Sequence, residues 1–393
     1  MSDRPTPEAD PPPAPRRHWL RWAAIACAVL VLLVSGVGWV LYQRLNGNIS
    51  TDEDTAALLR KYESERPTVR VKGAQNILLI GSDDRAGRNG RYGRDVGTQR
   101  SDTTIVLHLS RGRDRATALS IPRDLMVQIP HCERAGGKRQ QPVFGQFNYA
   151  YEKAGAACTI RTVEKLTGIR IDHHLIVDFD GFKRLVDAVG GVEMCLTAPV
   201  RDPRARVHLP AGRQVLNGEE ALGFVRARYT LGNGSDTQRI ARQQAFLSSL
   251  VHKVHDSGVL LNPTRLYPVL DAATSALTTD PGLNSLRDLY NLVRGVRSIP
   301  SDKVEFLTVP RRSFRENAAR DELVQPAADL LFAQLREDRP VTSKQSTVEA
   351  RGNTGGANPA KDDKAGASQG RQARSGASSA ASPPARGVCG KRR

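Results

Sequence analysis

Residues 76–85 read Asn-Ile-Leu-Leu-Ile-Gly-Ser-Asp-Asp-Arg, an apolar run that ends in glycine, serine and charged residues. Two more apolar runs follow, at 104–109 and 116–121. Short apolar runs bounded by Gly, Ser or Pro are typical of strands buried in a sheet. The sequence therefore predicts a central sheet that contains these three strands.

Helical and strand patterns alternate beyond this point. Helices are predicted at 148–155 and 160–168, each closed by a glycine, and strands at 174–179 and 192–196. Asp180 is expected to cap a helix at 182–189. Further helices are predicted at 219–225, 236–255, 265–277 and 283–296, and a last strand at 304–309. This order indicates an α/β fold with a sheet flanked by helices.

The run 22–41 carries no charge and is long enough to cross a membrane as a helix. Aromatic residues lie near both ends, and basic residues precede it, which places the N-terminus in the cytoplasm. The alternative is a cleaved signal peptide, but the run is longer than usual and no small-x-small site follows it cleanly. We therefore expect a single-pass anchor with everything after Tyr42 outside the cytoplasm.

The predicted organisation has five parts. A disordered cytoplasmic tail (1–21) precedes the anchor (22–42), and a linker (43–72) leads to one extracytoplasmic globular domain (73–339). The tail 340–393 is rich in Gly, Ser, Ala and charge, so it cannot bury enough surface to fold alone.

The formal net charge of +17 indicates polyanionic partners. For a membrane-tethered outer domain these are anionic lipids, lipid phosphates or anionic wall polymers. Nucleic acid is the other standard interpretation, but the external location and the lack of a DNA- or RNA-binding motif argue against it.

Five cysteines are present, and the oxidising compartment favours a Cys132–Cys158 disulfide. A Cys195–Cys389 pair is a weaker hypothesis. The remaining Cys27 lies in the membrane run, and no Cys/His spacing indicates zinc.

Charged residues occur at three strand ends between Gly81 and Asp124. Asp83 and Asp102 are the candidate metal ligands, because Mg²⁺ takes one or two carboxylates together with substrate phosphates. A lone aspartate at a strand end more often caps a turn or pairs with a neighbouring arginine. Three such segments so close together favour the metal site.

Arginines form two candidate phosphate-binding groups, since the guanidinium fork matches phosphate oxygens. The first group is Arg85, Arg100 and Arg123. The second is Arg226, Arg228, Arg239 and Gln243, with Arg242 beside them. If 225–229 is extended, Arg226 and Arg228 share one side, while Arg239 and Gln243 share a helix face. Solvated surface arginines are the alternative for each group.

Asp124 is either a general base or a partner that orients Arg123. No histidine stands in a nucleophile–base pattern, and the serines lack the surroundings of an esterase elbow. No Walker A loop or G-x-G-x-x-G is present, which argues against nucleotide use. The apolar stretches 175–179 and 182–189 either belong to the core or line a slot for a lipid chain.

These motifs resemble the LytR–CpsA–Psr (LCP) family. The resemblance rests on residues 76–85, Arg100-Ser101-Asp102-Thr103 and Ser120-Ile121-Pro122-Arg123-Asp124. It continues through 180–192, 216–229, Asp236, Arg239 and Gln243. It covers about residues 73–250. The long Arg/Gly-rich loop 86–99 and the C-terminal tail depart from the pattern.

The resemblance implies a three-layer α/β/α fold with a mixed central sheet and a pocket for a polyprenyl chain. It implies an Mg²⁺- (or Mn²⁺-) dependent phosphotransferase that moves a glycopolymer from a polyprenyl-diphosphate carrier to peptidoglycan. Asp83 and Asp102 would hold the metal. The diphosphate would be bound by Arg85, Arg100, Arg123, Arg226, Arg228, Arg239 and Gln243, and Asp124 would orient Arg123 or act as base. A lipid-diphosphate hydrolase, a non-catalytic envelope-polymer receptor and a transcriptional regulator are the alternatives.

Overall fold

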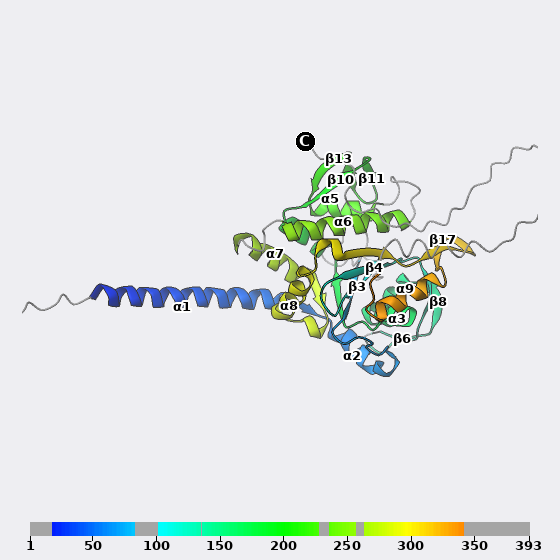
Figure 1. The fold of residues 1–393 in the computed structure, drawn as a ribbon, viewed down its shortest axis with the longest axis horizontal. Helices are drawn as coiled ribbons and strands as arrows, with labels where there is room; N and C mark the ends of the chain where they lie inside the picture. The colour runs from blue at the N-terminus through cyan, green and yellow to red at the C-terminus, as the bar shows by residue number, and fades with distance from the viewer. Residues whose placement is uncertain (1–17, 83–100, 135, 228–235, 257–262, 342–393) are drawn as a thin grey trace, which may run out of the picture.

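The computed structural model describes residues 18–82, 101–134, 136–227, 236–256 and 263–341. A long helix, α1 (His18–Gly47), extends away from the rest of the fold (Figure 1). Its segment Arg21–Gly47 is long and apolar enough to cross a membrane, and the apolar window is not buried in the protein. This fits the predicted single-pass anchor.

A seven-stranded mixed sheet forms the centre of the fold, in the order β1-β14-β9-β2-β3-β4-β15. Three neighbouring pairs are parallel: β1 with β14, β9 with β2, and β4 with β15. The strands are β1 (Ser50–Thr51), β14 (Leu277–Thr279), β9 (His173–Val177), β2 (Gln75–Ser82), β3 (Ser101–Leu109), β4 (Ala116–Ile121) and β15 (Val304–Thr308). The three strands that the sequence predicted first are therefore adjacent in the sheet.

Helices cover both faces of this sheet, which explains why its central strands are apolar on both sides. Leu78 and Ile80 of β2 belong to the main core, with α3 (Asn148–Thr167) and α9 (Ala327–Arg336). Ile77 points to the other face, where α8 (Leu286–Arg297) packs. The predicted three-layer α/β/α class is confirmed.

A second core lies beyond the sheet, around α4 (Phe179–Ala188), α5 (Gly218–Arg226) and α6 (Asp236–Asp256). It includes the hairpins β10 (Val192–Leu196) with β13 (Gly212–Leu216) and β11 (Val200–Asp202) with β12 (Val207–Leu209). Figure 1 shows α6 between these hairpins and the sheet. Val186, Leu216 and Phe246 are fully buried in this core. Within the apolar stretch 182–189, Val186 belongs to this core and Phe182 packs against it.

The remaining elements lie around the sheet. They are α2 (Glu53–Lys61), α7 (Pro263–Ala276) and three hairpins: β5 (Met126–Ile129) with β8 (Val143–Gln146), β6 (Cys132–Glu133) with β7 (Arg139–Gln140), and β16 (Arg311–Phe314) with β17 (Asn317–Leu323). The predicted Cys132–Cys158 disulfide is confirmed and ties β6 to α3. The other predicted partner, Cys389, lies outside the described residues.

The structure corrects three local predictions. The expected helices 148–155 and 160–168 form one element, α3, with a kink at Ala154 and Gly155, where Gly155 has a φ of 66°. Strand β9 ends at Val177, and Asp178 rather than Asp180 caps α4 by accepting from the Gly181 amide at 2.7 Å. Strand β15 is not the last element, since a hairpin and α9 follow it.

Candidate active site

Three strand ends meet at one edge of the central sheet. Ser82, the last residue of β2, lies opposite Ser101 at the start of β3, and Thr104 lies opposite Ile121 at the end of β4. Asp102, near the start of β3, and Arg123, just after β4, are therefore brought together. The predicted residues Asp83, Arg85 and Arg100 lie outside the described part of the chain.

Arg123 lies at the centre of this edge. Its Nη1 donates to Asp102 Oδ1 at 2.8 Å, and its Nε donates to Asp124 Oδ2 at 3.3 Å. Two carboxylates from different segments therefore fix one guanidinium, which limits its rotamer freedom before any ligand binds.

Asp124 is itself held from a second side. Its Oδ1 accepts from Gln146 Nε2 at 2.5 Å, and Arg320 Nη1 lies 3.8 Å from the same oxygen. Both carboxylate oxygens thus have partners. Of the two roles predicted for Asp124, this geometry favours orienting Arg123 over acting as a general base.

The second arginine group, remote in sequence, reaches the same place. Arg239 of α6 is 3% exposed, and its Nη2 donates to the backbone oxygen of Asp102 at 3.3 Å. Arg226 is the last residue of α5, and its guanidinium lies 4.5 Å from the centre of the Phe179 ring, a cation–π contact. The condition that 225–229 is extended does not hold at Val225 and Arg226, because α5 continues through Arg226. Arg228 is outside the described residues.

Amide side chains of α6 hold the surrounding elements in place. Gln243 Nε2 donates to the carbonyl of Val225 at 3.3 Å and so fixes the end of α5. The buried Gln244, which the sequence analysis missed, donates to Ser120 Oγ at 3.1 Å and to the Leu307 carbonyl at 3.0 Å. It ties α6 to the ends of β4 and β15. Its position four residues after buried Ile240 was the available signal.

The electrostatics of this edge favour anions. Burial opposes ionisation of Asp102, yet the charges of Arg239 and Arg123 lower its pKa below the ordinary value. Burial and the neighbouring Arg239 charge lower the pKa of Arg242. Among the described residues, the arginines near the site (Arg123, Arg226, Arg239 and Arg242) outnumber the two aspartates that pair with Arg123. Several guanidiniums at one edge of the sheet suit a phosphate-bearing ligand.

Asp102 also suits a hard cation. Its side chain is 27% exposed, and its lowered pKa keeps it ionised at neutral pH. An ionised, reachable carboxylate is the ligand type that Mg²⁺ prefers. No cluster of three metal-ligating side chains occurs in the part of the chain that the structure describes, so any cation here would rely on few protein ligands.

Comparison with known proteins gives consistent matches. A model described as the LytR_cpsA_psr family matches residues 41–337. The chain is 33% identical over 313 residues to the cell wall biosynthesis protein LcpA of Corynebacterium glutamicum, covering 72% of this chain but only 58% of LcpA. It is 30% identical over 302 residues to the polyisoprenyl-teichoic acid–peptidoglycan teichoic acid transferase TagV of Bacillus subtilis, covering 75% of this chain and 71% of TagV.

The structure of a LytR-Csp2A-Psr enzyme from Actinomyces oris aligns with a TM-score of 0.53 at 22% sequence identity. The alignment covers 69% of this chain and 93% of that one. At this level of identity the likeness shows a common fold. It agrees with the mixed α/β architecture described above.

Proposed function

The chain belongs to the LytR_cpsA_psr family, and on this premise we propose that it transfers a glycopolymer, with its phosphate, from a polyprenyl-diphosphate carrier to a peptidoglycan hydroxyl. TagV, one of the relatives, is named for such a transfer of teichoic acid. The observation that carries the proposal is the convergence of Arg123, Arg226 and Arg239 on Asp102 from separate parts of the chain. Guanidiniums gathered in this way match the oxygens of a diphosphate.

The proposed reaction is a displacement at phosphorus. A peptidoglycan hydroxyl attacks the sugar-proximal phosphorus, the bond to the bridging oxygen breaks, and polyprenyl phosphate leaves with the proton of the hydroxyl. Negative charge grows on the bridging oxygen as this bond breaks, and preorganised guanidiniums stabilise it. Arg123 is preorganised by Asp102 and Asp124, while buried Arg239 supplies a second positive charge beside Asp102. Arg85, Arg100, Arg228 and Gln243 are the further proposed diphosphate ligands.

Mg²⁺, or Mn²⁺ in its place, is the proposed cofactor, with Asp83 and Asp102 as its carboxylate ligands. The metal would neutralise charge on the diphosphate. The ionised state of Asp102 supports its part of this assignment.

The carrier lipid requires an apolar surface near the site. On the sheet face that α8 covers, Leu79, Leu107 and Leu175 are only partly buried. We assign this face to the polyprenyl chain. We also propose that α1 spans the cell membrane with the N-terminus in the cytoplasm, so that the catalytic domain meets the carrier outside.

The test is product analysis with the full chain in lipid vesicles. A lipid-diphosphate-linked sugar and peptidoglycan oligomers are supplied, with and without a divalent-metal chelator. Covalent sugar phosphate on the oligomer, lost with chelator, is the expected result. Free sugar phosphate as the main product would instead indicate a hydrolase, and binding without any product would indicate a receptor.

A further inference from the structure

Helix α8 carries an exposed basic face beside the membrane helix. Its inner side packs on the sheet through Leu289, Leu292 and Val296. Its outer side leaves Tyr290 62% exposed and Val293 52% exposed. The exposed basic residues of the same helix are Arg287, Arg294 and Arg297. We call these five residues the outer face of α8.

The charge of this face is not balanced within the described structure. None of its three arginines forms an ion pair with another described residue. In contrast, exposed arginines elsewhere, such as Arg312 and Arg213, pair with glutamates across a hairpin. Basic side chains interleaved with an exposed tyrosine and valine are the composition of a helix that lies on an anionic membrane surface.

The position of α8 fits such a surface. Asn46 near the end of α1 accepts a hydrogen bond from the Leu286 amide at 3.0 Å, where α8 begins. Asn48 donates to Asp271 of α7 at 3.0 Å. Figure 1 shows α7 and α8 at the end of the domain from which α1 leaves. The start of α8 is therefore fixed directly to the membrane helix.

The height of this junction above the bilayer follows from helix geometry. Asn46 lies five residues after Leu41, the last residue of the apolar run, so it is about 7.5 Å further along the axis. The headgroup layer on each side of the hydrocarbon is roughly 5–8 Å thick. The first turn of α8 therefore lies at the outer border of the headgroups, within reach of long arginine side chains.

We propose that the outer face of α8 docks on anionic lipid headgroups of the membrane that α1 crosses. The arginines bind lipid phosphates, and Tyr290 and Val293 enter the interface. This rests on the membrane position proposed for α1, but not on the transfer reaction. Docking would hold the partly buried apolar face under α8 next to the bilayer, where a polyprenyl chain would enter.

The test uses the full chain reconstituted in vesicles, with Cys27→Ala to remove the free thiol. A fluorophore is placed at Val293→Cys or, as a distant reference, at exposed Val215→Cys on β13. Quenching by a headgroup-labelled lipid is then measured in phosphatidylcholine with and without phosphatidylglycerol. We expect strong quenching at 293 that needs phosphatidylglycerol, and none at 215.

A variant without the arginines tests whether their charge causes the docking. Cofractionation of the protein with vesicles separately checks that α1 is inserted. The variant is Arg287→Gln/Arg294→Gln/Arg297→Gln, and its matched control, on exposed arginines far from α1, is Arg201→Gln/Arg206→Gln/Arg315→Gln. The equilibrium constant for docking should fall roughly fivefold for each arginine removed in the first variant and stay unchanged in the second. No quenching at 293 in an inserted protein, or quenching indifferent to lipid charge and to these arginines, overturns the proposal.

Discussion

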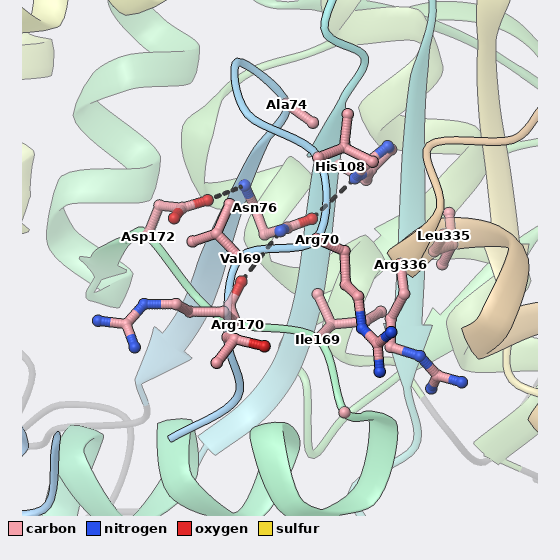
Figure 2. A pocket seen from close by; sticks show the side chains of 13 residues that line it. Val69, Arg70, Ala74, Asn76, His108, Ile169, Arg170, Asp172, Leu335 and Arg336 are labelled. Carbon is pink, nitrogen blue, oxygen red and sulfur yellow. Dashed lines mark hydrogen bonds between the residues drawn. The ribbon is translucent and has the colours of Figure 1, made fainter. Parts of the chain in front are cut away.

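At one end of β2 lies the candidate active site, and at the other lies a shallow pocket where Asn76, His108 and Asp172 meet (Figure 2). Arginine, histidine and aspartate side chains line this pocket, which we call the pocket end of β2. The backbone N–H of Asn76 donates to Asp172, and its side-chain Nδ2 donates to the Arg170 carbonyl. The Oδ1 atom of Asn76 forms a hydrogen bond with His108 Nδ1. These contacts join the start of β2 to β3 and to the chain before β9.

The two ends differ in the contacts that their arginines make. At the pocket end two arginines pair with carboxylates: Arg66 with buried Glu164 at 2.7 Å, and Arg170 with Glu63 at 2.6 Å. At the site end, Arg226 contacts the Phe179 ring and Arg239 donates to the Asp102 backbone oxygen. Ion pairs of the first kind hold structure together, whereas several guanidiniums gathered at one edge of a sheet suit a phosphate-bearing ligand. The presence of ionisable side chains alone therefore does not identify an active site.

The largest expected effect is on stability, at the ion pair between Arg66 and Glu164. Glu164→Ala leaves Arg66 buried without its main partner, so the free energy of unfolding should fall by about 3–5 kcal/mol. Chemical denaturation measures this. The transfer rate per folded molecule should stay unchanged. Glu63→Ala, which removes the exposed partner of Arg170, should lower the free energy of unfolding by no more than about 1 kcal/mol.

At the site end, charge should matter for rate more than for folding. Asp102→Asn keeps the shape but removes the charge that holds Arg123, and we expect a rate loss of about 10²–10³-fold with little change in stability. Asp172→Asn at the pocket end is the matched control. Equal rate losses in the two variants would contradict the assignment of function to one end.

A smaller effect is expected at Gln146. Gln146→Leu removes a hydrogen bond to a carboxylate, and Asp124 then orients Arg123 less well. We expect kcat to fall about 10-fold without a matching rise in KM. This loss corresponds to the low end of the roughly 1.5–3 kcal/mol that a hydrogen bond to a charged group contributes. Gln128→Leu, on the paired strand of the same hairpin, should have no effect. A KM change alone would instead indicate substrate contact.

The smallest effect depends on pH. The hydrogen bond with Asp280 raises the pKa of His173 against the effect of burial. Its stabilisation is complete below about pH 6.5 and is lost as pH rises through the raised folded-state pKa. The stability difference between wild type and His173→Gln should be about 0.5–1 kcal/mol at pH 6 and should vanish in alkali. Thermal melting against pH measures it, and His208→Gln, exposed on β12, serves as control. A difference that grows with pH would contradict this sign.

The sequence alone predicted the central strands and the gathering of charged residues at their ends, because buried strands appear as apolar runs bounded by turn residues. It did not predict Arg320 and Gln146 beside Asp124. These side chains come from short hairpins, and β17, Asn317–Leu323, is largely polar and lacks an apolar alternation. Gln244 was missed because a single buried amide on a helix looks like a surface residue. Its role appears only when α6 packs on the ends of β4 and β15.

One measurement compares the two sheet ends directly. Arg123→Ala and Arg170→Ala each remove a partly buried, carboxylate-paired arginine, one from each end. The rate at which labelled sugar-proximal phosphate passes from the lipid carrier to peptidoglycan is followed for both. We predict a loss of about 10²–10³-fold for Arg123→Ala and an unchanged rate per folded molecule for Arg170→Ala. Similar rates for both variants, or a larger loss for Arg170→Ala, would contradict the account.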